Sequence, residues 1–299
     1  MENFVLTIAF LSIGMGLKRL PDFPREGGSV LNLFVIHVAL PALVLLKIPE
    51  LTLSRELLIP ALMPWAMLFL WAAFLLLLAC FFGWSRPITG CLLLLVPLGN
   101  TSFLGIPMVS AFFGQEAVPY AVLYDQLGSF LGLATYGSLV IALYGNGPER
   151  PTPAGVARKI LLFPPFLALL AALFFSRLAW PALLTALLKA LAATLVPVVM
   201  IAVGFQFTLK LERETLTPLG LGLAIKLVAA PLLALALCRL FGFNGEPARV
   251  AIFEAGMPPM VSAGALAILA ELSPPLTAAL VGLGLVASFA TLPLLYQLL

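Results

Sequence analysis

The chain has 299 residues, of which 62% are hydrophobic and only 10% are charged, and its formal net charge is +3. A soluble globular domain is about 25% charged, so this composition excludes a soluble enzyme or binding module and indicates an integral membrane protein. The small net charge gives no support to nucleic-acid binding, and a chain with a single histidine, His37, excludes zinc motifs built from two histidines.

Apolar segments long enough to span a membrane follow one another along the whole chain. A spanning helix needs about 20 apolar residues, with a range of roughly 17–25. The connections between the segments are short and carry Pro, Gly and charge, which leaves no room for a soluble domain. The ten predicted spans are 3–18, 29–47, 57–83, 87–113, 117–144, 156–175, 180–209, 215–241, 247–270 and 274–297.

The loop charges predict the orientation of the spans. Cytoplasmic loops carry an excess of Lys and Arg. One side receives nine basic residues: Lys18, Arg19, Arg25, Arg86, Arg150, Arg158, Lys159, Lys210 and Arg213. The other side receives five: Lys47, Arg55, Arg177, Arg239 and Arg249. This bias predicts a multi-pass protein of the cell membrane with both termini outside the cytoplasm.

Three sequence pairs point to an internal duplication. Pro-Met-Val-Ser-Ala occurs at 107–111 and again at 259–263, an offset of 152 residues. The segment at 53–60 matches 211–218 at five of eight positions, and Pro41 corresponds to Pro197. Five spans per half is an odd number, so the second half must insert upside down, as in many secondary transporters. The predicted repeats are residues 1–150 and 151–299.

Proline and glycine interrupt the fourth and ninth spans. Pro97 and Pro107 lie in the fourth, and Pro258 and Pro259 lie in the ninth. Proline removes a backbone donor and clashes with the preceding turn, and it disfavours helical geometry in the residue before it. We therefore expect both spans to be broken, with unwound backbone at 100–107 and 255–259.

Irregular backbone at membrane depth is tolerated only where it is buried in protein or lines a cavity. Because proline favours the first turn of a helix, Pro107 and Pro258–Pro259 are expected to open the second half-helices. The N-termini of those half-helices would suit an anion such as a carboxylate. Two kinks that only shape a bundle are the alternative. The predicted substrate-binding residues are Asn100, Thr101, Ser102, Gly105, Pro107, Met257, Pro258 and Pro259.

Two acids lie inside predicted spans, Asp125 in the fifth and Glu254 in the ninth. Charges at membrane depth are costly and usually functional. With Gln126 and Ser129, these acids form the predicted coupling-ion site, which would hold Na⁺ at Asp125 and Glu254 or a proton on a carboxyl group. Alternatively, each acid only hydrogen-bonds to broken backbone. Lys226 would pair with one of the acids or reach the interface, and Lys189 is expected to snorkel.

Several motifs resemble the auxin efflux carrier family. They are NTSFLGIP at 100–107, LNLFVIHVALP at 31–41, LYDQ at 123–126, LVPVVMIAVG at 195–204 and GMPP at 256–259. They follow the order of that family over the whole chain. The connector at 145–155 lacks the large central loop of the plant carriers, which fits a prokaryotic member.

The resemblance implies an all-α membrane protein with ten transmembrane helices in two inverted five-helix repeats. Helices 4 and 9 would cross at their breaks, as in bile acid symporters and NhaA-type antiporters. It also implies a scaffold of helices 1, 2, 6 and 7, a transport domain of helices 3–5 and 8–10, elevator-type alternating access, homodimerisation and small organic anions as cargo. FEAGM at 253–257 is similar to a segment of the bile acid–sodium symporters whose Glu binds sodium. Here Pro258 and Pro259 replace the Gln-Asn that follows there, which favours protons over Na⁺.

The sequence therefore predicts a secondary active transporter for an auxin-like or other mono- or dicarboxylate, coupled to a cation. It would work in contact with membrane lipid, without a cofactor and without nucleic acid. A uniporter of the same fold and a non-transporting sensor or receptor are the alternatives. A channel would need a continuous polar stripe, and an intramembrane enzyme would need a catalytic acid pair or a partner for the single histidine; neither pattern is present.

Overall fold

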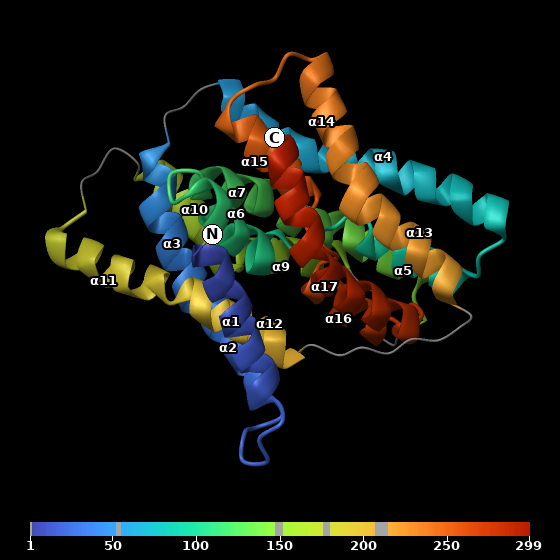
Figure 1. Ribbon diagram of the computed structural model, residues 1–299, viewed down its shortest axis with the longest axis horizontal. Coiled ribbons are helices and arrows are strands. Elements are labelled where there is room, and N and C mark those ends of the chain that lie inside the picture. Colours follow the sequence, from blue (N-terminus) through green and yellow to red (C-terminus); the bar gives the residue numbers. More distant parts are fainter. Residues whose placement is uncertain (1, 52–54, 147–151, 176–179, 207–214) are drawn as a thin grey trace. The chain divides into compact units, whose positions relative to one another are not determined.

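The computed structural model describes residues 2–51, 55–146, 152–175, 180–206 and 215–299 (Figure 1). Within these ranges, regular secondary structure is helical apart from one isolated antiparallel bridge between Gly99 and Pro259. Part of the second sequence pair, residues 53–54 and 211–214, lies outside the described residues. The same holds for four of the basic residues on which the predicted orientation rests: Arg150, Arg177, Lys210 and Arg213.

The described helices are long and apolar enough for six membrane spans, or seven if the bent pair α9 and α10 counts as one. Three shorter apolar helical stretches, Phe4–Leu17, Arg86–Leu95 and Thr101–Phe113, accompany them. The protein is thus an all-helical, multi-pass membrane protein. Each of the ten predicted segments coincides with helical structure, but ten spans in an inverted repeat stay a prediction.

The chain divides into two compact units. Unit 1 consists of Met1–Ser54, Ser102–Val122 and Lys159–Phe207. Its helices are α1 (Glu2–Leu17), α2 (Gly27–Phe34), η1 (Val35–Ala39), α3 (Leu40–Lys47), η2 (Ile48–Glu50), α6 (Ile106–Phe113), α10 (Pro164–Phe174), α11 (Ala182–Ala193) and α12 (Leu195–Gln206).

Unit 2 consists of Arg55–Thr101, Leu123–Arg158 and Thr208–Leu299. Its helices are η3 (Arg55–Leu57), α4 (Leu58–Phe82), α5 (Arg86–Leu95), η5 (Asp125–Phe130), η6 (Leu133–Gly137), α8 (Ser138–Tyr144), α13 (Leu216–Ala224), η8 (Ile225–Ala229), α14 (Ala230–Leu240), α15 (Glu246–Ala255), α16 (Val261–Leu269) and α17 (Pro274–Leu298). Three helices run from one unit into the other: η4 (Thr101–Gly105), α7 (Val118–Tyr124) and α9 (Pro153–Leu161). Each unit draws helices from both predicted repeats.

In unit 1, α1 packs along α12 through two glycines (Figure 1). A Cβ atom on Gly14 would lie 2.8 Å from the carbonyl carbon of Ile201, and one on Gly204 would lie 2.9 Å from that of Leu11. Small residues let membrane helices approach backbone to backbone, so these glycines set the spacing of α1 and α12.

Three π-helical turns each end two residues before a proline. They are η1 before Pro41, η4 before Pro107 and η8 before Pro231. A helical proline at position i lacks the donor for the carbonyl at i−4 and clashes with it. In all three cases residue i−4 is the middle of the π turn, so the widened turn accommodates the proline without ending the helix.

In unit 2, α4 contains an internal proline, Pro64, and fixes η5. The Pro64 ring lies where a Cβ on Gly128 would be, and Trp65 Nε1 donates to the Leu127 carbonyl at 2.8 Å. The last turn of α4 closes at Gly83, whose φ of +63° suits glycine. These contacts hold the π-helical segment that begins with Asp125.

Candidate functional site

The two predicted breaks are present, and their positions differ from the prediction in one case. The first lies between the end of α5 at Leu95 and the start of η4 at Thr101, and the second lies between Ala255 and Val261. The expected unwinding through 100–107 is wrong, because Thr101–Phe113 is helical. Pro107 is the second residue of α6 and opens no half-helix, since the widened π turn of η4 accommodates a proline without ending the helix. Pro258 and Pro259 do not open a half-helix either, because both lie in the second break and α16 begins only at Val261, after the extended residue Met260.

The two breaks pair with each other inside unit 2. Asn100 N donates to the Pro258 carbonyl at 2.8 Å, and Met260 N donates to the Leu98 carbonyl at 3.1 Å. These hydrogen bonds form the antiparallel bridge between Gly99 and Pro259 and satisfy backbone groups that the breaks expose. The unwound parts of the fourth and ninth predicted spans therefore meet, and we call this place the crossing.

Asp125 lies beside the crossing at the start of η5 and is fully buried. Its carboxylate accepts hydrogen bonds from Thr101 Oγ1 at 2.6 Å and from Gln126 Nε2 at 2.7 Å. The Thr101 bond ties the residue that follows the first break to η5. Hydrogen bonds of this kind offset the cost of burying a carboxylate.

Glu254 occupies the last turn of α15, and its side chain is fully buried. Within the described chain neither of its carboxyl oxygens has a hydrogen-bond partner. Asp125 and Lys226 both lie close enough to act on its charge. An isolated buried carboxylate is costly, so Glu254 needs a proton, a cation or a ligand donor.

Lys226 is the residue at the crossing that the sequence analysis left out of its predicted site. It lies in η8, is only 3% exposed and donates from Nζ to the Ala255 carbonyl at 3.2 Å. A Cβ on Gly99 would lie 3.1 Å from this Nζ, so glycine at 99 lets the ammonium reach the bridge. The signal available in the sequence was a lysine in the interior of the predicted span 215–241.

Two amide side chains complete the cluster, which we call the crossing cluster: Asn100, Thr101, Asp125, Gln126, Lys226 and Glu254. Asn100 Nδ2 and Gln126 Oε1 are buried and lack hydrogen-bond partners within the described residues. Native proteins pair nearly all such groups with protein, water or ligand. One donor and one acceptor are therefore available here to a bound molecule.

The remaining predicted site residues divide between the units. Met257, Pro258, Pro259 and Ser129 are buried in unit 2 with the crossing cluster. Ser102, Gly105 and Pro107 belong to unit 1, and all three lie inside the continuous helix Thr101–Phe113. The structure thus brings together most of the predicted substrate and coupling residues around Gly99–Pro259.

Three backbone carbonyls at the crossing are already engaged by the chain itself. The carbonyls of Leu98, Ala255 and Pro258 accept hydrogen bonds from the chain itself. The Lys226 ammonium already supplies a positive charge. No group of three or more His, Cys, Asp or Glu side chains that could hold a metal ion occurs in the part of the chain that the structure describes.

Comparison with known proteins gives the family. A sequence model described as membrane transport protein matches residues 1–296. The chain belongs to the membrane transport protein family. This match confirms the resemblance to auxin efflux carriers drawn from the motifs. As a member of the membrane transport protein family, the protein is a transporter and not an enzyme.

Two archaeal proteins are similar to this chain over nearly their whole length. An uncharacterized transporter of Methanothermobacter thermautotrophicus is 26% identical, over 98% of this chain and 96% of the relative. An uncharacterized transporter of Methanocaldococcus jannaschii is 25% identical, over 91% of this chain and 90% of the relative. Neither name gives a substrate.

Proposed function

We propose that the protein is a secondary active transporter of small organic anions in the cell membrane, coupled to protons. The observation that carries this proposal is the crossing: two unwound segments pair at Gly99–Pro259, surrounded by a buried cluster with ionisable and unpartnered polar groups. Unwound backbone and intramembrane charge are costly and are typical of transport sites.

Three groups at the crossing would attract an anion. Lys226 supplies a buried positive charge, and Asn100 Nδ2 supplies an unused donor. The first turn of α16 adds backbone N–H groups, because Met260 at its N-cap makes no side-chain cap. A carboxylate is the anion class that these donors suit.

Proton coupling rests on Glu254. A negatively charged substrate cannot easily enter beside two ionised carboxylates in a low-dielectric site. Protonation of Glu254 would remove one of these charges without a metal ion. By linkage, a proton that favours substrate binding is itself bound more tightly when substrate is present. The substrate and the proton would then move together.

The proposal includes an elevator mechanism in a ten-helix inverted repeat. In an elevator mechanism the binding site moves together with one rigid part of the protein. The crossing cluster lies entirely within one compact unit, which is consistent with such a movement. The family resemblance adds the assignment of helices 1, 2, 6 and 7 to a scaffold through which a homodimer would form.

Counterflow in proteoliposomes tests the proposal. Vesicles loaded with unlabelled carboxylate, such as malonate or indole-3-acetate, should accumulate the labelled acid transiently and saturably. An imposed proton gradient, and not a Na⁺ gradient, should drive net accumulation. Glu254→Gln should retain counterflow but lose the response to the proton gradient, and Asp125→Asn should act similarly. Glu116→Gln, which changes an exposed acid, is the matched control.

Each other outcome points elsewhere. Counterflow without any response to pH or Na⁺ would indicate a uniporter whose acids are structural. Saturable binding without counterflow would indicate a receptor built on this fold. Flux without counterflow would indicate a channel.

A further inference from the structure

A cavity of about 350 Å³ lies wholly within unit 1, apart from the crossing cluster. The end of α3 with η2, the helix α6, the loop and start of α7, and the junction of α11 with α12 form its walls. Its volume lies in the range of about 300–1,000 Å³ that is typical of small-molecule sites. No residue of the crossing cluster lines it.

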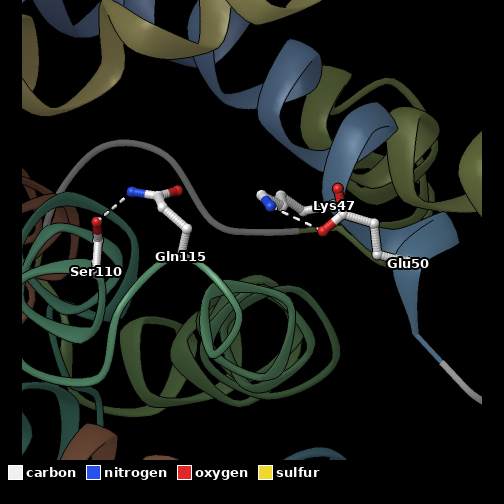
Figure 2. Close-up of polar contacts among 4 residues, drawn as sticks. All are labelled: Lys47, Glu50, Ser110 and Gln115. Carbon is white, nitrogen blue, oxygen red and sulfur yellow. Dashed lines mark hydrogen bonds and ion pairs between the residues drawn. The ribbon is translucent and has the colours of Figure 1, made fainter.

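Two polar pairs face this cavity (Figure 2). On one wall, Lys47 Nζ forms an ion pair with Glu50 Oε2 at 2.7 Å, with the Lys47 side chain only 17% exposed. On another wall, Gln115 Nε2 donates to Ser110 Oγ at 2.6 Å. The Ser110 oxygen accepts this bond, so its own proton stays available for a ligand.

Lys189 adds a positive charge to the cavity that no acidic side chain of the lining neutralises. The ion pair neutralises Lys47 with Glu50, whereas Lys189, on α11, has no hydrogen-bond or ion-pair partner within the described residues. Lys189 was expected to snorkel, and the residue is exposed. In the structure it lines a cavity that also presents the Ser110 hydroxyl and the second N–H of Gln115.

The rest of the lining is aliphatic, including Leu43, Leu46, Ile106 and Leu195. One cationic group with neighbouring neutral donors selects an anion, and the aliphatic wall selects an apolar body. Ser110 belongs to the first Pro-Met-Val-Ser-Ala copy; its counterpart Ser262 does not line this cavity.

We propose that this cavity is a second binding site, for a small monocarboxylate with an apolar body. Lys189 binds the carboxylate, Ser110 and Gln115 donate to it, and the aliphatic wall contacts the body. An anionic lipid headgroup could supply a similar charge, so the test separates soluble acids from lipid. The site does not depend on the mechanism proposed for the crossing.

Lysine labelling tests this site on the full chain in phosphatidylcholine nanodiscs. An amine-acetylating reagent is applied with and without hexanoate, and the labelling rate of each lysine is read by mass spectrometry. Hexanoate should slow acetylation of Lys189 severalfold and leave the exposed Lys159, on α9, unchanged. Hexanol, which has the same body without the negative charge and does not compete for an amine-selective reagent, should not protect Lys189.

Two variants locate the effect. Ser110→Ala removes a donor to the bound carboxylate, so about tenfold more hexanoate should be needed for the same protection. Glu254→Gln should leave protection of Lys189 unchanged, so failure at the crossing and failure here are distinguishable.

Three results would overturn the proposal. The first is no protection by hexanoate at any concentration that leaves the protein folded. The second is equal protection by hexanol, which would make the cavity a purely apolar surface. The third is protection that appears only when phosphatidylglycerol is added to the nanodiscs and that hexanoate does not change, which would assign the site to a lipid headgroup.

Discussion

Replacing Gly14 by alanine should destabilise the protein by forcing α1 away from α12. The new Cβ would lie 2.8 Å from the carbonyl carbon of Ile201 and 2.9 Å from the nitrogen of Phe205, and closer still to the Ile201 oxygen. All three are backbone atoms of one helix, so none can move aside alone. The helices themselves must separate.

The size of the effect follows from these distances. Non-bonded carbon atoms are normally about 3.5–4.0 Å apart, so the helices must separate by about 1 Å at this point. A gap of that size forfeits a quarter to a half of the dispersion energy of the atoms along it. Overpacking of this kind costs about 1–3 kcal/mol. Gly204→Ala should cost a similar amount, since its Cβ meets the backbone of Leu11.

Thermal unfolding of the purified protein in detergent measures the effect. The matched control is Gly16→Ala, two residues further along α1, where a Cβ would meet nothing within 4 Å. That change should be neutral or stabilising by up to about 1 kcal/mol, because alanine favours helix over glycine. The double variant at 14 and 204 should cost less than the two single changes together, because one separation relieves both clashes.

Equal stability of Gly14→Ala and Gly16→Ala would refute the close approach of α1 and α12. If the stability losses of Gly14→Ala and Gly204→Ala simply add in the double variant, the two clashes are not relieved by one movement of the helices. Losses of stability add at independent sites and fail to add at coupled neighbours.

Two further substitutions test the support of the crossing. Thr101→Val removes the 2.6 Å hydrogen bond to Asp125, so it should lower the free energy of unfolding by about 1–3 kcal/mol and slow counterflow. Thr101→Ser keeps the hydroxyl and should stay close to wild type. Equal counterflow in the two variants would contradict a positioning role for the hydroxyl. Gly128→Ala places a methyl group on the Pro64 ring and should displace η5, reducing unfolding temperature and transport, whereas Gly220→Ala in α13, which meets nothing within 4 Å, should do neither. Normal transport by the Gly128 variant would show that η5 does not depend on α4.

Local sequence properties alone indicated the helical segments, the two interrupted spans and the buried acids. Runs of about 20 apolar residues give the helical segments, because a membrane requires that backbone groups be satisfied within each helix. Proline and glycine beside Asn100 and near Glu254 gave the two interrupted spans, since both residues act on the backbone of their own segment. Intramembrane acids marked the site because their burial is costly wherever they lie.

Tertiary structure decided where the backbone opens and which groups meet there. Pro107 was expected to open a half-helix, but the π turn of η4 accommodates it inside a continuous helix, and the break lies before Thr101. Asn100 N bonds to Pro258 O, and Lys226 reaches Ala255 O, because packing within unit 2 brings these distant segments together. Local propensity carries no information about such pairings. Lys189, which was expected to snorkel, is an exposed residue, and only the packing of α3, α6 and α11 makes it part of a cavity wall as well.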